Sequence, residues 1–195
     1  FIRDPAMYQD TFRAAEQMIR DTGKLLDISV TPTFPSTTLG YTKIGPLVED
    51  RNGIHFYQFA QHKEKPDYDT AKQFIDDGNY LWHANYYMWT PRKFVEAYKQ
   101  YAPGIGDHLD ELLGVIESGD QKQLAAVYSK MEKISIDYAV TEKMNPQDVL
   151  IIRGDFGWGD LGSWDTVYDE LSHKTDEEGN LAKGNWHGLD TRDSL

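Results

Sequence analysis

Apolar and polar residues follow two spacings along the chain, and each spacing predicts one kind of element. From Asp4-Pro5 to Gly23, apolar side chains recur every three or four positions, which predicts a helix that starts at a proline and ends at a glycine. Short apolar runs over residues 26–30 and 149–152 are typical of buried strands. Helices and strands that succeed one another in this way favour an α/β fold.

The middle of the chain repeats these patterns. Strand-like residues 41–48 and 54–61 flank Asp50-Arg51-Asn52-Gly53, a turn sequence that predicts a hairpin. The aromatic-rich residues 80–89 predict another strand, which Thr90-Pro91 ends, and residues 31–41 are expected to form an extended loop. Further helices are predicted over residues 68–77, 91–101, 105–118, 121–131 and 164–171, a helix start at Ser135 within residues 133–140, a polar turn over 176–179, and a last strand over 184–189.

A glycine-rich turn follows the strand at residues 149–152. Gly157, Gly159 and Gly162 flank Asp160, and Ser163 is expected to cap the helix behind them. Glycine tolerates positive φ and lets another group approach closely, and an acid at the carboxyl end of a strand lies where open α/β sheets bind ligands. Such an acid can equally bond backbone N–H groups in a tight turn. Spacing alone does not decide between these readings.

Composition narrows the choice of partners. With 20 basic and 32 acidic residues the 195-residue chain carries a net charge of -12, which argues against binding to nucleic acid or to an anionic membrane. No cysteine is present, which excludes disulfides, zinc–thiolate sites and a thiol nucleophile. A phosphorylated substrate would need local cations or a divalent metal. We expect a cytoplasmic protein. Its oligomeric state stays open, and a homo-oligomer is one possibility.

Two further clusters offer binding chemistry. Lys65 follows the second hairpin strand within a basic–acidic–basic segment that ends at Pro66. This segment is either a solvated strand end or the place where Lys65 meets a phosphate as a point charge. In the aromatic strand, alternation is expected to put His83 and Asn85 on one face, where both could contact a ligand. A buried structural role for His83 is the simpler alternative.

Five segments together resemble the mannose-1-phosphate guanylyltransferase family of sugar-phosphate nucleotidyltransferases, over nearly the whole chain. The loop over residues 32–41 is similar to that family's Pro-Thr-x-Pro-x-Thr-Gly-Tyr-Gly-Tyr motif, and residues 64–66 are its Glu-Lys-Pro triplet. Residues 80–85 resemble its Tyr-Leu-Trp-Asn-Ser-Gly strand. Residues 135–140 match Ser-Ile-Asp-Tyr-Ala-Val, and residues 158–164 match Trp-x-Asp-x-Gly-Ser-Trp.

The resemblance implies a fold and a reaction. The fold is Rossmann-like and glycosyltransferase-A-like, a three-layer mixed α/β sheet of which residues 1–195 form the C-terminal portion. In the reaction, mannose 1-phosphate and GTP give GDP-mannose and pyrophosphate with Mg²⁺. The protein's tasks would be positioning and charge neutralisation.

The resemblance also implies roles for individual residues. Asp160 would hold Mg²⁺, which prefers oxygen ligands, and Lys65 would neutralise a phosphate across a cleft that the two side chains share. Glu64 would accept hydrogen bonds from sugar hydroxyls, and the Gly40 N–H would contact the sugar. Asp137 lies in a matching motif, where a ligand role and helix capping both remain open.

The sequence departs from the family at several positions. His83 stands where the family has asparagine and Asn85 where it often has glycine, so Asn85 has taken over a sugar contact or the sugar preference has changed. Thr38 and Leu39 replace a Gly-Tyr pair. The family's glycine-rich nucleotide-binding segment and its second metal-binding acid would precede Phe1, so we expect a fragment without turnover of its own. Guanine specificity therefore cannot be read from these residues.

Two other functions remain open at this stage. One is another sugar-1-phosphate nucleotidyltransferase, of the thymidylyl or uridylyl type. The other is a non-catalytic subunit of the same fold that senses a sugar nucleotide. An intact or a degraded upstream nucleotide-binding loop would distinguish an enzyme from a sensor.

Overall fold

The structure, a computed structural model, describes residues 1–162, 164–172, 175–177, 179–181 and 192. It divides into two compact units, of which one comprises residues 9–154 and the other residues 1–8 and 155–195. The predicted cap at Ser163 and the predicted strand over residues 184–189 lie outside the described residues. No helix within the described ranges is long and apolar enough to cross a membrane.

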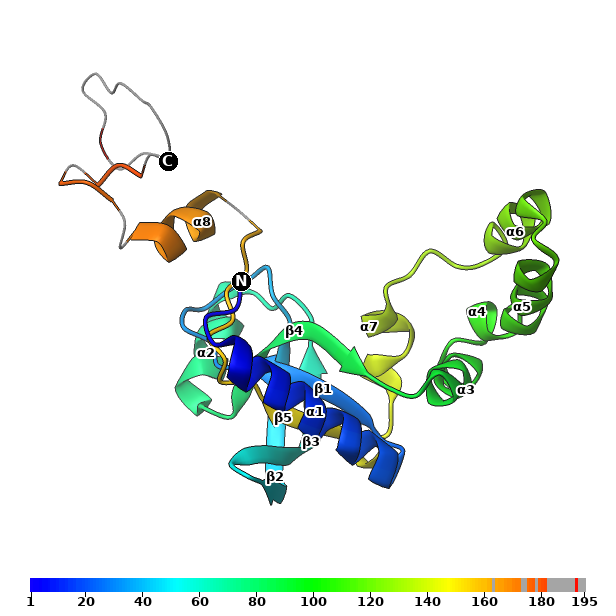
Figure 1. Ribbon diagram of the computed structural model, residues 1–195, viewed down its shortest axis with the longest axis horizontal. Helices are drawn as coiled ribbons and strands as arrows, with labels where there is room; N and C mark the ends of the chain where they lie inside the picture. The colour runs from blue at the N-terminus through cyan, green and yellow to red at the C-terminus, as the bar shows by residue number, and fades with distance from the viewer. Residues whose placement is uncertain (163, 173–174, 178, 182–191, 193–195) are drawn as a thin grey trace. The chain divides into compact units, whose positions relative to one another are not determined.

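The larger unit contains five strands that form one mixed sheet (Figure 1). Their bounds are β1 Leu25–Val30, β2 Tyr41–Arg51, β3 Ile54–Lys63, β4 Tyr80–Met88 and β5 Val149–Arg153. The sheet order is β1-β4-β2-β3-β5, and β5 pairs back to β1, so the strands close on themselves. Strands β1 and β5 run parallel and the other pairs antiparallel. The predicted mixed α/β class is confirmed, and the closure is an addition to it.

The closure has a local cause in the β2–β3 hairpin. Its turn is Asn52-Gly53, and both residues have positive φ, as a two-residue hairpin turn requires. Away from the turn, the pairing between the two strands shifts register at three places along β2. They lie between Lys43 and Ile44, between Ile44 and Leu47, and between Leu47 and Glu49. Such irregularities bend and twist a strand pair. The bent hairpin therefore reaches β4 through β2 and β5 through β3.

The helices match the predicted positions closely. Their bounds are α1 Pro5–Thr22, α2 Tyr68–Asp77, α3 Pro91–Tyr101, α4 Pro103–Gly106, α5 Leu109–Ser118, α6 Gln121–Tyr128, α7 Ile136–Ala139 and α8 Trp164–Leu171, with short 3₁₀ turns η1 Thr141–Lys143 and η2 Pro146–Asp148. The predicted helix over residues 105–118 is interrupted between Gly106 and Leu109. Gly106 lies against α3, where a Cβ atom would come 2.5 Å from the Lys99 Cα. Ser135 occupies the cap position of α7 without a capping hydrogen bond.

The sheet and helices α3 and α7 share one apolar cluster. Leu25 and Ile151 of the parallel pair are fully buried in it, and Ala97 of α3 and Ala139 of α7 pack there as well. Buried apolar area of this kind supplies most of the stability of a domain. The cluster fixes α7 against the sheet and thereby sets the position of the polar groups described next.

Candidate functional site

The site is centred on an acid inside the buried strand β1. All six residues of β1 are buried, and Asp27 is only 2% exposed. One carboxylate oxygen of Asp27 accepts hydrogen bonds from the Ser29 and Thr42 hydroxyls, each at 3.1 Å. The other oxygen lies 3.0 Å from Nδ1 of His83 on β4. Asp27 therefore ties β1 to β2 and β4 through polar bonds within an apolar sheet.

His83 is as deeply buried as its partner. Its side chain is 2% exposed, and its backbone N–H donates to the Gly40 carbonyl at 2.8 Å. Burial alone would lower the pKa of His83, but the charge and hydrogen bond of Asp27, followed by the charges of Asp137 and Glu64, outweigh it and raise the pKa. Burial tends to raise the pKa of Asp27, but the charge and hydrogen bond of His83, followed by the charge of His62 and the hydrogen bond from Ser29, outweigh it and lower the pKa. The two groups therefore favour a buried ion pair.

Asp137 of α7 approaches the other nitrogen of the same ring. Its Oδ1 atom lies 3.8 Å from His83 Nε2, too far for a hydrogen bond, and accepts one from the Tyr87 hydroxyl at 3.0 Å. The Tyr87 oxygen also lies 3.1 Å from the Thr141 hydroxyl. Burial and the nearby charges of Asp27 and Asp137 raise the pKa of Tyr87, so its hydroxyl remains a donor. Asp137 is thus held by a tyrosine and flanked by an imidazole.

A second branch leads from Asp27 to the surface. The Thr42 hydroxyl lies 3.1 Å from Nδ1 of His62, and Nε2 of His62 lies 3.4 Å from Glu64. A Cβ atom added to Gly40 would overlap the Glu64 carboxylate and lie 3.0 Å from the His62 ring. A glycine at position 40 therefore leaves the space that Glu64 occupies.

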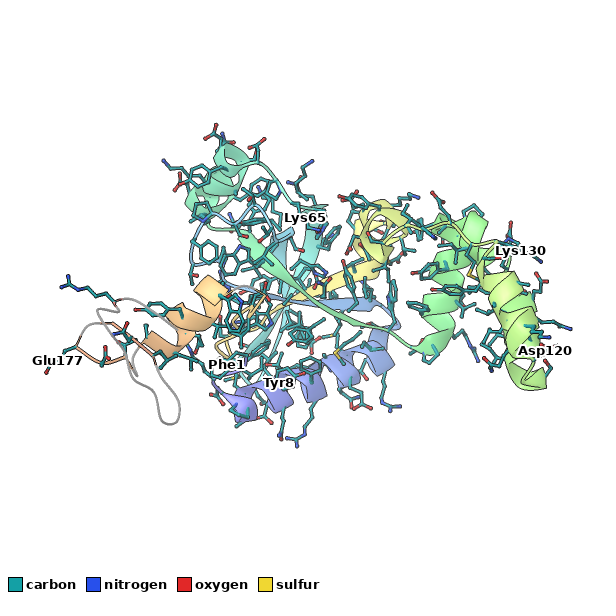
Figure 2. The ribbon with its side chains drawn as sticks, turned by 90° about the horizontal axis from the view of Figure 1, so that it is seen from above. Phe1, Tyr8, Lys65, Asp120, Lys130 and Glu177 are labelled. Carbon is teal, nitrogen blue, oxygen red and sulfur yellow. The ribbon has the colours of Figure 1, made fainter. Side chains whose placement is uncertain are left out.

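Lys65 ends this branch at the surface. It lies two residues beyond the end of β3, and its side chain, labelled in Figure 2, is 62% exposed. The Lys65 Nζ atom lies 3.4 Å from the Glu64 carboxylate, and its backbone has φ of 42°, which is uncommon outside glycine. Unusual backbone angles are frequent at functional sites. The ammonium group is accessible to an anion from solvent.

The structure brings most of the predicted residues together. Five of the six residues predicted to bind substrate lie in this cluster within the larger unit, namely Gly40, Glu64, Lys65, His83 and Asp137. The sixth, Asn85, is exposed and has φ of 58°. A β-bulge opposite Ile28 and Ser29 interrupts the alternation of β4, so the prediction that regular alternation extends from His83 to Asn85 is wrong.

The glycine-rich turn belongs to the smaller unit and is described by itself. Trp158 pairs with Ile2 in an isolated bridge, and Gly157 has φ of 65° beside the Arg3 side chain. Asp160 is exposed, and a Cβ atom on Gly162 would lie 3.0 Å from its carboxylate. Gly162 therefore leaves room around the Asp160 oxygens. That Asp160 faces Lys65 stays a prediction.

The carboxylate oxygens of Asp160 are suitable ligands for a magnesium ion. Mg²⁺ is often bound by one or two carboxylates together with substrate phosphates. Within the part of the chain that the structure describes, no group of three or more histidine or acidic side chains is arranged to hold a metal ion. A cation at Asp160 would thus take the rest of its ligands from phosphate oxygens, from water or from groups outside the described residues.

The sequence patterns did not single out three members of the cluster, Asp27, Thr42 and His62. A signal for Asp27 was present, because an acid inside an otherwise apolar strand must find partners when it is buried. No comparable signal marks Thr42, since threonine is common in strands. Its role depends on the pairing of β2 with β4 and β3.

Comparison with known proteins places the chain in a family. A family model described as nucleotidyl transferase matches residues 1–177. The mannose-1-phosphate guanylyltransferases of Escherichia coli K12 and Sinorhizobium fredii are 28% and 31% identical to the chain, over 90% and 89% of its length. A solved structure from Thermus thermophilus, named mannose-1-phosphate geranyltransferase, matches 94% of the chain with a TM-score of 0.75 and 29% identity.

The matches cover only part of these relatives. The chain spans 37% and 33% of the two guanylyltransferases and 50% of the solved chain. The family match nevertheless covers the whole described cluster and the glycine-rich turn. The chain belongs to the nucleotidyl transferase family.

Proposed function

We propose that this chain supplies the sugar-phosphate side of a mannose-1-phosphate guanylyltransferase, as the C-terminal portion of its catalytic domain. The observation that carries the proposal is the convergence of Gly40, Glu64, Lys65, His83 and Asp137, which come from separate segments of the chain. The names of the similar guanylyltransferases support the same reaction. The substrates would be GTP and mannose 1-phosphate.

In this reaction a phosphate oxygen of mannose 1-phosphate attacks the α-phosphorus of GTP. A new P–O bond forms, the bond between the α- and β-phosphates breaks, and pyrophosphate leaves with its electron pair. Lys65 is the exposed cation beside Glu64 and would hold a phosphate oxygen by a charge-assisted hydrogen bond. Glu64 would accept from sugar hydroxyls, close to the side-chain-free Gly40. His83 and Asp137 would support the sugar from the sheet and from α7.

Asp160 is the residue that would hold Mg²⁺, which neutralises phosphate charge when it is bound. Such a metal and one lysine would supply positive charge in a chain whose net charge is -12. The nucleotide base has no partner in this proposal. We expect the isolated 195 residues to be inactive, and GDP-mannose synthesis by them would contradict this expectation.

His83 favours one alternative, in which the enzyme accepts a sugar phosphate other than mannose 1-phosphate. An imidazole is larger than the amide that the resembling family carries there, so the sugar preference of this chain could differ. The test is an assay of the intact protein against a panel of four nucleoside triphosphates and several hexose 1-phosphates. We expect the highest kcat/KM with GTP and mannose 1-phosphate. A preference for another pair would replace the substrate assignment, and absence of turnover with any pair would favour a sensor.

A further inference from the structure

Asp27 has no role in the proposed reaction, although it is the one acidic residue of the described chain that is buried, with an exposure of 2%. A buried carboxylate loses hydration and is retained only with several partners. Asp27 has three partners, and two of them, Thr42 and His83, lead toward the proposed site. This arrangement calls for a role beyond holding the sheet together.

The first path is the chain of hydrogen bonds from Asp27 through Thr42 and His62 to Glu64, and the donor in each bond follows from the number of available protons. The Thr42 hydroxyl has one proton, and it donates to Asp27. The Thr42 oxygen must then accept from Nδ1–H of His62. Glu64 is an acceptor when it is ionised, so a bond from His62 Nε2 requires a proton on that nitrogen as well. Asp27 thereby sets the direction of the bonds at Thr42 and at His62 Nδ1, and the ionised Glu64 sets that of the bond from His62 Nε2.

The second path runs through His83. The bond to Asp27 makes Nδ1 a donor and fixes the plane of the ring. Nε2 is buried and has no hydrogen-bond partner in the described part of the chain. The charged and titratable groups around the ring are Asp27 on β1, His62 and Glu64 at the end of β3, Tyr87 on β4 and Asp137 on α7. A ring without Asp27 would be free to turn toward Asp137.

We infer that Asp27 is the positioning residue of the sugar-phosphate site, which orients Glu64 through Thr42 and His62 and fixes the ring of His83. Asp27 touches no substrate in this scheme. The inference rests in part on the proposed function, because that function gives Glu64 and His83 their ligand. The hydrogen-bond directions themselves do not depend on it.

Substitution of Asp27 by asparagine replaces one acceptor oxygen by an amide donor. The amide must face either His83 Nδ1–H or the Ser29 and Thr42 hydroxyls, so one branch loses its direction. If Thr42 turns to accept from the amide, it donates to His62 instead, and Nδ1 of His62 loses its proton. Thr42→Val removes the first path alone and leaves the Asp27–His83 bond in place.

The test uses the intact protein labelled with ¹⁵N-histidine, as wild type, Asp27→Asn, Thr42→Val and the exposed control Asp76→Asn. Ring ¹⁵N shifts give the protonated nitrogen of His62 and His83 across a pH titration, and calorimetry gives the affinity for mannose 1-phosphate. We expect Asp27→Asn to change the ring protonation of His62 or His83 and to lower the pKa of His83. The affinity for mannose 1-phosphate should fall about tenfold, which corresponds to the loss of one hydrogen bond to the ligand. Thr42→Val should change His62 and the affinity only, and Asp76→Asn should match the wild type.

The outcomes separate the positioning role of Asp27 from the proposed binding of mannose 1-phosphate. Wild-type ring titrations and wild-type affinity in both Asp27→Asn and Thr42→Val would overturn the positioning role. If Asp27→Asn does not fold, Thr42→Val decides the path to Glu64 by the same readouts. If the wild type does not bind mannose 1-phosphate while the ring shifts change as expected, the proposed substrate fails and the hydrogen-bond directions stand.

Discussion

Two ion pairs in this protein have similar geometry and opposite surroundings. Asp27 and His83 lie 3.0 Å apart with side chains 3% and 2% exposed, whereas Lys99 and Asp110 on α3 and α5 lie 2.7 Å apart with 43% and 74% exposed. Lys130, which is labelled in Figure 2 and lies just after α6, makes a comparable exposed pair with Glu111 at 3.0 Å. Distance alone would rank the Lys99–Asp110 pair above the Asp27–His83 pair and the Lys130–Glu111 pair equal to it.

Burial reverses that ranking. An exposed pair is screened by water and gains little over its hydrated, separated partners. A buried pair loses hydration, so removal of one partner leaves a charge without compensation. The comparison teaches that the pair in the sheet is costly to break, while its contribution to stability relative to an apolar pair is small. Its retention is better explained by the orientation that it imposes on Glu64 and His83.

The largest effect is expected from Asp27→Asn. This change removes the hydrogen-bonded counter-ion of the buried His83 and leaves only the more distant Asp137 and Glu64, so we expect the free energy of unfolding to fall by about 3 kcal/mol, the lower end for broken buried pairs. Urea unfolding followed by circular dichroism measures it. A loss no larger than that of an exposed acid would show that the sheet does not depend on this pair.

A smaller loss is expected when Asp137 loses its donor. Tyr87→Phe removes the hydroxyl that bonds Asp137 and contacts Thr141, and should lower the free energy of unfolding by about 2 kcal/mol, as for a hydrogen bond to a charged group. Tyr57→Phe on β3 is the matched control, with an effect near zero. Equal unfolding midpoints for the two variants would contradict the assigned bond.

The fold was largely predictable from the sequence, and the site only in part. Start and stop signals at Pro5, Gly23 and Thr90-Pro91 coincide with the observed helix ends, because caps and turns depend on neighbouring residues. The closure of the sheet depends instead on register shifts in β2 and β3, for which local patterns carry no signal.

The candidate site shows the same division. Glu64, Lys65 and Gly40 were found through motifs, whereas the Asp27 branch requires knowledge of which strands are neighbours. Asn85 lies in the bulge between His83 and Tyr86, so the alternation of an ideal strand does not hold there. Sequence reasoning thus identified Glu64, Lys65 and the buried His83, and missed Asp27 and Thr42, the buried groups that connect Glu64 with His83.

The pH dependence should distinguish the two kinds of pair. The pKa of folded His83 is raised above its ordinary value of 6.5, so its contribution to stability is complete below pH 6.5 and is lost as the pH rises through the folded value. The pKa of Asp27 is lowered, so its contribution is present above 3.8 and is lost as the pH falls through the folded value. The stability difference between wild type and Asp27→Asn should therefore shrink above pH 6.5.

Urea unfolding at a series of pH values measures this difference. His55→Gln is the control, since His55 pairs with Asp50 at the surface with 45% of its side chain exposed. That variant should keep the wild-type pH profile. A stability difference for Asp27→Asn that does not change between about pH 5 and 9, a range that spans the ordinary histidine pKa, would argue against a charged His83.

The smallest effect is expected from the same substitution at the surface. Asp110→Asn removes the partner of Lys99 and one acid from the first turn of α5, and should lower the free energy of unfolding by less than about 1 kcal/mol. Added salt should reduce the effect further, because exposed charges are screened. A loss equal to that of Asp27→Asn would remove the distinction drawn from burial.

The measurement that tests the proposed function most directly compares two lysines at the end of one hairpin. Lys65→Ala and Lys63→Ala each remove one exposed cation, but the Lys65 ammonium is the one that pairs with Glu64. Titration calorimetry of the intact protein with mannose 1-phosphate gives the affinity of each variant. We predict that Lys65→Ala weakens binding at least about tenfold, as for one charge-assisted hydrogen bond, while Lys63→Ala remains near wild type. Equal affinities for the two variants would contradict the proposed role of Lys65.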